Sequence, residues 1–101
     1  MKIQVLYVPG CPNYLPAVDR VQKLLVSESL RVDIERVPIN SDAEAAALQF
    51  PGSPTVRING TDVEPNRTHV TGLACRLYAN SSGIPSEEML KLALSRANQE
   101  E

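Results

Sequence analysis

The chain lacks tryptophan and has one phenylalanine and one histidine among its 101 residues, so its core must be built mainly from aliphatic side chains. It contains only two cysteines, too few for the disulfide framework of a small secreted domain. In a reducing compartment such a pair is more often catalytic, metal-binding or inert than structural. Ten basic and twelve acidic residues form no basic block, so nucleic acid is not an expected partner.

No apolar run approaches the length of a membrane span, and Met1 leads directly into strand-like residues without room for a secretory leader. We therefore expect a cytoplasmic protein with no membrane partner. The acidic residues are scattered, and the sequence has neither a glycine-rich phosphate loop nor zinc-ligand spacing. Acid/base hydrolysis and a zinc site thus have no candidate residues, and His69 is expected to be a solvent-exposed loop histidine.

Hydrophobic periodicity predicts an α/β fold with the order β-α-β-α-β-β-α in one domain, residues 1–101. Residues 2–8 are apolar on both faces, which is typical of an interior strand covered by helices on each side. The other predicted elements are a helix over 14–28 with Asn13 as N-cap, a strand over 31–37 with one exposed edge or face, a short helix over 42–49 capped by Ser41, strands over 55–58 and 61–64 joined at Asn59-Gly60, and a helix over 86–97 capped by Ser86. We expect a four-stranded mixed sheet with helices on both faces, the 14–28 and 86–97 helices sharing one face and the short helix covering the other.

Residues 65–85 show no clear periodicity, and a loop of that length is unusual in so small a domain. Within it, residues 73–78 are compatible with either a short helical turn or a strand. This loop contains Cys75, so its course matters for any chemistry of the two cysteines.

Cys11 lies in the predicted turn between the first strand, which ends at Val8, and the first helix. The first N–H groups of a helix have no internal partner and the helix dipole is positive there, so a thiolate is stabilised. The thiolate is the form of cysteine that acts as nucleophile and metal ligand. The alternative is that Cys11 is a small buried hydrophobic residue, as free cysteines often are.

Residues 6–14 and 52–56 together resemble the thioredoxin and glutaredoxin superfamily. In that family a cysteine opens the first main helix, and an X-Pro-Thr or similar tripeptide leads into a later strand. The resemblance covers most of the chain and implies a thioredoxin-like fold. It also implies that Cys11 is the reactive thiol and that Pro54 follows a cis peptide bond and packs beside it.

The resemblance departs from the dithiol members of the family at one position. They carry Cys-x-x-Cys, whereas here Tyr14 replaces the second cysteine. The implied chemistry is therefore of monothiol type, in which Cys11 forms a mixed disulfide with a substrate thiol or with glutathione. The residues implied to bind substrate flank the two motifs and are Pro12, Asn13, Tyr14, Ser53, Pro54 and Thr55. Ser53 is expected to offer its main-chain N–H and C=O to an extended substrate peptide.

Cys75 is the second candidate catalytic residue. In related folds the segment after the hairpin runs back beside the reactive cysteine, which would make Cys75 a distant resolving thiol. The alternative is that Cys75 packs under the loop with Leu73 and Leu77. The sequence does not decide between them, because a disulfide requires a Cα separation of ~4.4–6.8 Å that no pattern encodes.

The sequence is compatible with three functions. The first is a thiol–disulfide oxidoreductase acting through Cys11, with or without Cys75, on a protein or small-molecule thiol or disulfide. It needs no cofactor, with glutathione as a candidate co-substrate. The second is a thiolate module that binds a soft ion such as Cu(I) or Hg(II), or an iron–sulfur cluster held by Cys11 across a dimer. The third is a non-catalytic thioredoxin-like domain that binds a peptide or partner beside Pro54.

Overall fold

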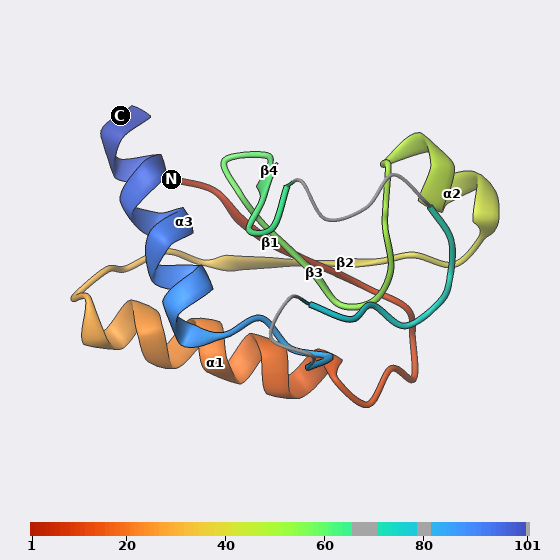
Figure 1. Cartoon of the computed structure of the whole chain (residues 1–101), viewed down its shortest axis with the longest axis horizontal. Helices are drawn as coiled ribbons and strands as arrows, with labels where there is room; N and C mark the ends of the chain where they lie inside the picture. The colour runs from red at the N-terminus through yellow and green to blue at the C-terminus, as the bar shows by residue number, and fades with distance from the viewer. Residues whose placement is uncertain (66–70, 79–81, 101) are drawn as a thin grey trace.

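The computed structural model describes residues 1–65, 71–78 and 82–100, so His69 lies outside the described part of the chain. Its elements run β1 (Ile3–Tyr7), α1 (Tyr14–Ser27), β2 (Ile34–Pro38), α2 (Asp42–Ala47), β3 (Thr55–Ile58), β4 (Thr61–Asp62) and α3 (Glu87–Glu100) (Figure 1). The predicted α/β class and the β-α-β-α-β-β-α order are confirmed.

The four strands form one mixed sheet in the order β2-β1-β3-β4. β1 pairs in parallel with β2 and antiparallel with β3, and β4 is antiparallel to β3. The prediction that the first strand is interior is therefore confirmed, and the alternating second strand lies at an edge. β2 begins at Ile34 rather than at residue 31, because Ile34 pairs with Ile3, the first residue of β1.

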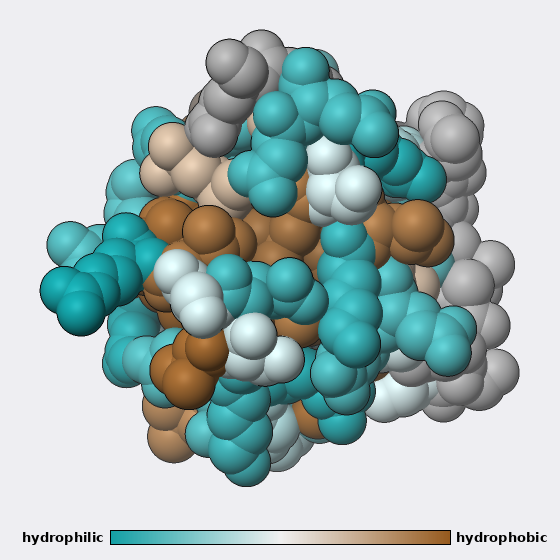
Figure 2. Space-filling view, turned by 90° about the vertical axis from the view of Figure 1, so that its left-hand side faces the viewer, coloured by the Kyte–Doolittle hydropathy of each residue, from teal (hydrophilic) through white to brown (hydrophobic). Residues whose placement is uncertain are grey.

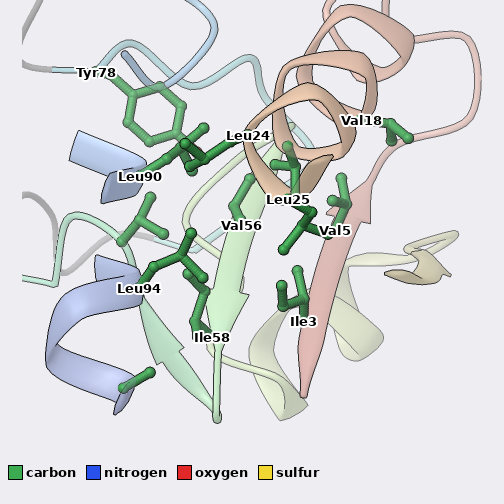
Figure 3. Close-up of a cluster of buried hydrophobic side chains, with 13 residues drawn as sticks. Ile3, Val5, Val18, Leu24, Leu25, Val56, Ile58, Tyr78, Leu90 and Leu94 are labelled. Carbon is green, nitrogen blue, oxygen red and sulfur yellow. The ribbon is translucent and has the colours of Figure 1, made fainter. Parts of the chain in front are cut away.

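The larger core cluster lies between one face of the sheet and the helices α1 and α3 (Figure 3). Its members labelled in the figure are Ile3, Val5, Val18, Leu24, Leu25, Val56, Ile58, Tyr78, Leu90 and Leu94. Each fully buried aliphatic side chain of this kind stabilises the fold by about 1.5–3 kcal/mol relative to exposure. Tyr78 joins this core from the segment that shows no periodicity in the sequence.

A smaller cluster covers the opposite face of β1. Leu6 points to this side and packs with Ile39, with Ala45 of α2 and with Phe50. β1 thus buries Ile3 and Val5 on one face and Leu6 on the other, which explains why its sequence is apolar on both.

Local signals in the sequence account for the ends of the elements. Ser41 Oγ accepts the Glu44 N–H at 3.1 Å, and Ser86 Oγ accepts the Met89 N–H at 3.1 Å, so the predicted caps at Ser41 and Ser86 are confirmed. Asn59 and Gly60 both have positive φ, 53° and 81°, as a tight hairpin turn requires.

β4 is shorter than the predicted strand over 61–64. The Glu64 N–H donates to Asp62 Oδ1 at 2.8 Å, which turns the chain away from β3.

The end of the molecule that carries the last turns of α1 and α3 shows apolar residues broken up by hydrophilic ones (Figure 2). Two shallow hollows lie here, one between Glu28, Leu30 and α3, the other between residues 1–3 and 31–35. Neither lining contains a cysteine, so the candidate chemistry lies elsewhere. Within the described ranges, no helix has the length and apolar character needed to cross a membrane.

Candidate functional site

Ser53 is hydrogen-bonded to Val8, the residue between the end of β1 and the turn that carries Cys11. Its Oγ accepts the Val8 N–H at 3.0 Å, and the Val8 carbonyl accepts the Cys11 N–H at 3.0 Å. The peptide bond between Ser53 and Pro54 is cis, as the resemblance implies. Two segments that are distant in the sequence thus meet where β1 leaves the sheet.

Cys11 occupies the predicted turn and is half-buried. Helix α1 begins at Tyr14 with Asn13 as its N-cap, so Cys11 lies two residues before the cap. Its carbonyl accepts the Tyr14 N–H at 3.3 Å, which closes the turn. Cys11 belongs to neither core cluster, so the alternative of a buried hydrophobic residue is wrong.

Tyr14, which replaces the second thiol of a Cys-x-x-Cys motif, is stacked on Tyr7. The two ring centroids are 3.6 Å apart and the ring planes differ by 8°. The side-chain hydrogen bond with Tyr14 raises the pKa of the Tyr7 hydroxyl above its ordinary value of 10.0. Tyr14 therefore packs on Tyr7, the last residue of β1, and against the larger core cluster.

Asn13 lies against the loop that precedes α3. A Cβ at Gly83 would overlap the Asn13 side-chain amide, so the two residues are in direct contact. Arg20 Nη1 donates to the Pro85 carbonyl at 3.0 Å and holds the same loop against α1. Asn13 makes no capping hydrogen bond with its side chain. Of the residues around Cys11 implied to bind substrate, Pro12 is exposed, while Asn13 and Tyr14 are half-buried.

The Cys75 segment, residues 72–78, runs parallel to residues 50–53. The Ser53 N–H donates to the Ala74 carbonyl at 3.0 Å, and the Arg76 N–H donates to the Ser53 carbonyl at 3.0 Å, which forms a parallel bridge between Ser53 and Cys75. A further bond joins the Gly72 N–H to the Phe50 carbonyl at 3.1 Å. The expectation of free main-chain groups at Ser53 is wrong, because the chain itself pairs with both.

From Cys75 to Tyr78 the side chains alternate in exposure. Cys75, Leu73 and Leu77 are exposed, whereas Arg76 and Tyr78 are buried. This part of the segment is therefore extended rather than helical, and the alternative in which Cys75 packs under the loop with the two leucines is wrong. Both cysteines are free thiols in this structure.

Arg76 is the centre of a buried polar cluster that the sequence did not reveal. Its guanidinium binds Asp62 at two points, Nη1 to Oδ2 at 2.6 Å and Nη2 to Oδ1 at 2.9 Å. It also donates to Thr55 Oγ1 at 3.2 Å and to the Glu64 carbonyl at 3.3 Å, and it lies 4.2 Å from the centre of the Tyr78 ring. Burial alone would lower the pKa of Arg76, but the hydrogen bonds and charges around it, Asp62 first, raise it.

The same cluster supports residues 52–55, the turn with the cis Ser53–Pro54 bond, which is called the cis-proline corner below. The Tyr78 hydroxyl donates to the Pro54 carbonyl at 2.6 Å, and the Thr55 hydroxyl donates to the Gly52 carbonyl at 2.6 Å. Burial raises the pKa of Tyr78 well above its ordinary value of 10.0. Ser53, Pro54 and Thr55 are all fully buried, so these residues, implied to bind substrate, form the inside of the corner rather than its surface.

One weak signal for this cluster is present in the sequence. Arg76 and Tyr78 are two positions apart, the spacing of residues on one face of an extended segment. Only the fold, which brings Asp62 opposite them, shows that this face is buried.

No group of three or more His, Cys, Asp or Glu side chains in residues 1–65, 71–78 and 82–100 is arranged to hold a metal ion.

Neither a scan against protein-family models nor searches of curated proteins and of solved structures found a match. The topology and the cis-proline corner define an α/β protein with a four-stranded mixed sheet, an arrangement consistent with a thioredoxin-like fold.

Proposed function

We propose that this protein is a thioredoxin-like thiol–disulfide oxidoreductase in which Cys11 is the nucleophile and Cys75 the resolving thiol. The observation that supports the proposal is the convergence of both cysteine-bearing segments on Ser53. The Ser53 Oγ accepts a hydrogen bond from the Val8 N–H, and the Val8 carbonyl accepts one from the Cys11 N–H. The main chain of Ser53 is hydrogen-bonded to Ala74 and Arg76, the residues on either side of Cys75.

The exposure of the two thiols favours this assignment. Cys75 is exposed and Cys11 is half-buried in a turn, whereas structural cysteines are generally inert because they are buried. Tyr14 excludes a neighbouring resolving thiol, so only Cys75 remains as a partner within the chain. The resemblance of Cys11-Pro12 and Ser53-Pro54-Thr55 to the thioredoxin superfamily supports the same chemistry.

The proposed reaction is a two-step exchange. The Cys11 thiolate attacks a substrate disulfide, forms a mixed disulfide and expels one substrate thiolate, which takes up a proton. The Cys75 thiolate then attacks Cys11 Sγ, which expels the second substrate thiolate and leaves a disulfide between Cys11 and Cys75. Two electrons pass from the protein to the substrate, and a small thiol such as glutathione returns them by the reverse sequence.

The test uses the reduced protein with glutathione disulfide, beside Cys11→Ser and Cys75→Ser. The unmodified chain should become a monomer without free thiols, Cys75→Ser should stop at the mixed disulfide, and Cys11→Ser should not exchange. The internal disulfide should raise the melting temperature, because the chain-entropy estimate for so long a loop is ~4 kcal/mol. Thiols that stay free, with Cys11 reacting no faster than a short reference peptide, would refute the proposal.

The same convergence of two thiols favours a second candidate, a site for a soft ion such as Cu(I) held between two thiolates. Anaerobic titration of the reduced chain against a competing chelator separates the two functions. One ion per chain, lost in both single variants, together with absent exchange would favour the metal site. The third possibility, a peptide-binding module, has less support, because the groups it would use at Ser53 are already bonded.

A further inference from the structure

We propose that Cys11 acts on small thiols and disulfides and not on extended polypeptides, because the Cys75 segment already fills the sheet edge that a polypeptide would use. This inference rests on the proposed exchange chemistry and adds its substrate class. It is supported by three properties of the segment: its main-chain pairing, its anchoring and its close approach to the backbone of Gly52.

The main-chain pairing leaves no docking groups at Ser53. A peptide that extends a sheet gains affinity from the free N–H and C=O groups of the edge. The Ser53 N–H and C=O are already hydrogen-bonded to Ala74 and Arg76, each at 3.0 Å. The Phe50 carbonyl likewise accepts the Gly72 N–H at 3.1 Å. An incoming polypeptide would therefore have to break these bonds before it could form its own.

The anchoring makes that displacement costly. Arg76 and Tyr78 point inward from the segment and are 4% and 0% exposed. Removing the segment would separate Arg76 from Asp62 and Tyr78 from the Pro54 carbonyl. Breaking a buried ion pair leaves an uncompensated charge, which is among the most unfavourable local changes in a protein.

The close approach at Gly52 shows that the segment is packed directly on this backbone. Gly52 has φ +139°, and a Cβ there would lie 3.0 Å from the Ala74 carbonyl oxygen and 3.1 Å from Arg76 Cβ. No side chain or second strand fits between the two segments. A small disulfide needs no such edge, because it requires only access to the sulfur of Cys11.

The test measures Cys11 alone, in Cys75→Ser, with three disulfides that carry the same thiopyridyl leaving group. One is built on glutathione, one on a nine-residue β-prone peptide with a central cysteine, and one on that peptide with alternate amides N-methylated. Each rate is divided by the rate of the same disulfide with free cysteamine. The N-methylated peptide is the matched control, because it keeps the side chains and loses the main-chain donors along one edge of the strand.

We expect the two peptides to react at equal normalised rates, neither faster than the glutathione disulfide. A preference of about tenfold or more for the unmethylated peptide, equivalent to about 1.4 kcal/mol of main-chain contact, would overturn the inference. A smaller preference supports it.

A second measurement does not depend on exchange chemistry. The amide signals of Ser53 and Arg76 are followed in the unmodified reduced chain while the same peptide, with serine in place of its cysteine, is added. If the chemical shifts of both amides stay unchanged and their hydrogen exchange stays slow, the Cys75 segment keeps its place at Ser53, as inferred. Shifted signals or faster exchange of these amides would overturn the inference. If Cys11 reacts with none of the three disulfides, the proposed function fails, and this measurement still decides whether the edge is open.

Discussion

Tyr78 and Pro54 are 24 positions apart, yet the Tyr78 hydroxyl donates a 2.6 Å hydrogen bond to the Pro54 carbonyl. Tyr78 is fully buried in the larger core cluster, so this bond forms away from water. It joins the end of the Cys75 segment to the residue that follows Ser53. The position of Cys75 is therefore coupled to the packing of the core.

Tyr78→Phe should lower the free energy of unfolding by about 1–3 kcal/mol, because it leaves the buried Pro54 carbonyl without its donor. Urea unfolding at neutral pH measures the change. A loss as large as that expected for Tyr78→Ala, which also removes the ring, would show that packing rather than the hydroxyl is responsible.

The raised pKa of Tyr78 predicts a loss of stability in alkali. The folded state holds the hydroxyl proton more tightly than the unfolded state, so the stabilisation is complete below the ordinary value of 10.0 and is lost as the pH rises above it. Unfolding free energy should fall above pH 10.0 less steeply in Tyr78→Phe than in the unmodified chain. If the unfolding free energy fell equally steeply with pH in the two proteins, the raised pKa of Tyr78 would be contradicted.

Asp62→Asn should destabilise the fold by about 3 kcal/mol, since it removes the charge that binds the buried Arg76 guanidinium at two points. Asparagine keeps an oxygen that can accept the Glu64 N–H, so the substitution tests the charge. Lys23→Gln is the matched control: its 3.0 Å pair with Asp19 is exposed, and the expected change is below about 0.5 kcal/mol. Similar urea midpoints for the two variants would show that the buried pair contributes little.

Gly52→Ala should displace the Cys75 segment, because its Cβ would meet Ala74 and Arg76 at 3.0–3.1 Å. Gly60→Ala is the control, since Gly60 also has a positive φ, 81°, but its Cβ would meet nothing within 4 Å. We expect Gly52→Ala to cost about 1–3 kcal/mol more than the control and to speed hydrogen exchange at the Arg76 amide. Equal costs would mean that only the backbone conformation matters.

Gly83→Ala should be coupled to Asn13. The new Cβ would overlap the Asn13 amide, so the substitution should cost more in the unmodified chain than in Asn13→Ala. A double-mutant cycle by urea unfolding should give an interaction free energy of about 0.5–3 kcal/mol, as for residues in contact. Additive costs would show that Asn13 moves aside freely.

Much of the fold follows from local sequence features. The two apolar faces of β1, the caps at Ser41 and Ser86 and the turn at Asn59-Gly60 each depend on residues close together in the chain. The position of Cys11 in a strand-to-helix turn follows for the same reason. Such features predict element order and the cysteine turn well.

The rest of the site depends on contacts between distant segments. Arg76 and Asp62 are 14 positions apart, and no periodicity connects them, so their burial together is set by the tertiary fold. The pairing of Ser53 with residues on both sides of Cys75 is likewise non-local. The resemblance to the thioredoxin superfamily implied free main-chain groups at Ser53, whereas the fold pairs both groups with the Cys75 segment.

The ion pair beneath the Cys75 segment has a consequence for the response to ionic strength. The side chains of Arg76 and Asp62 are 2% and 16% exposed, whereas those of Lys23 and Asp19 are 78% and 59% exposed. Mobile ions screen exposed pairs over a distance of ~8 Å at physiological ionic strength but reach buried pairs much less. The Cys75 segment is thus held by an attraction that added salt leaves almost intact, while the pairs on the helix surfaces weaken.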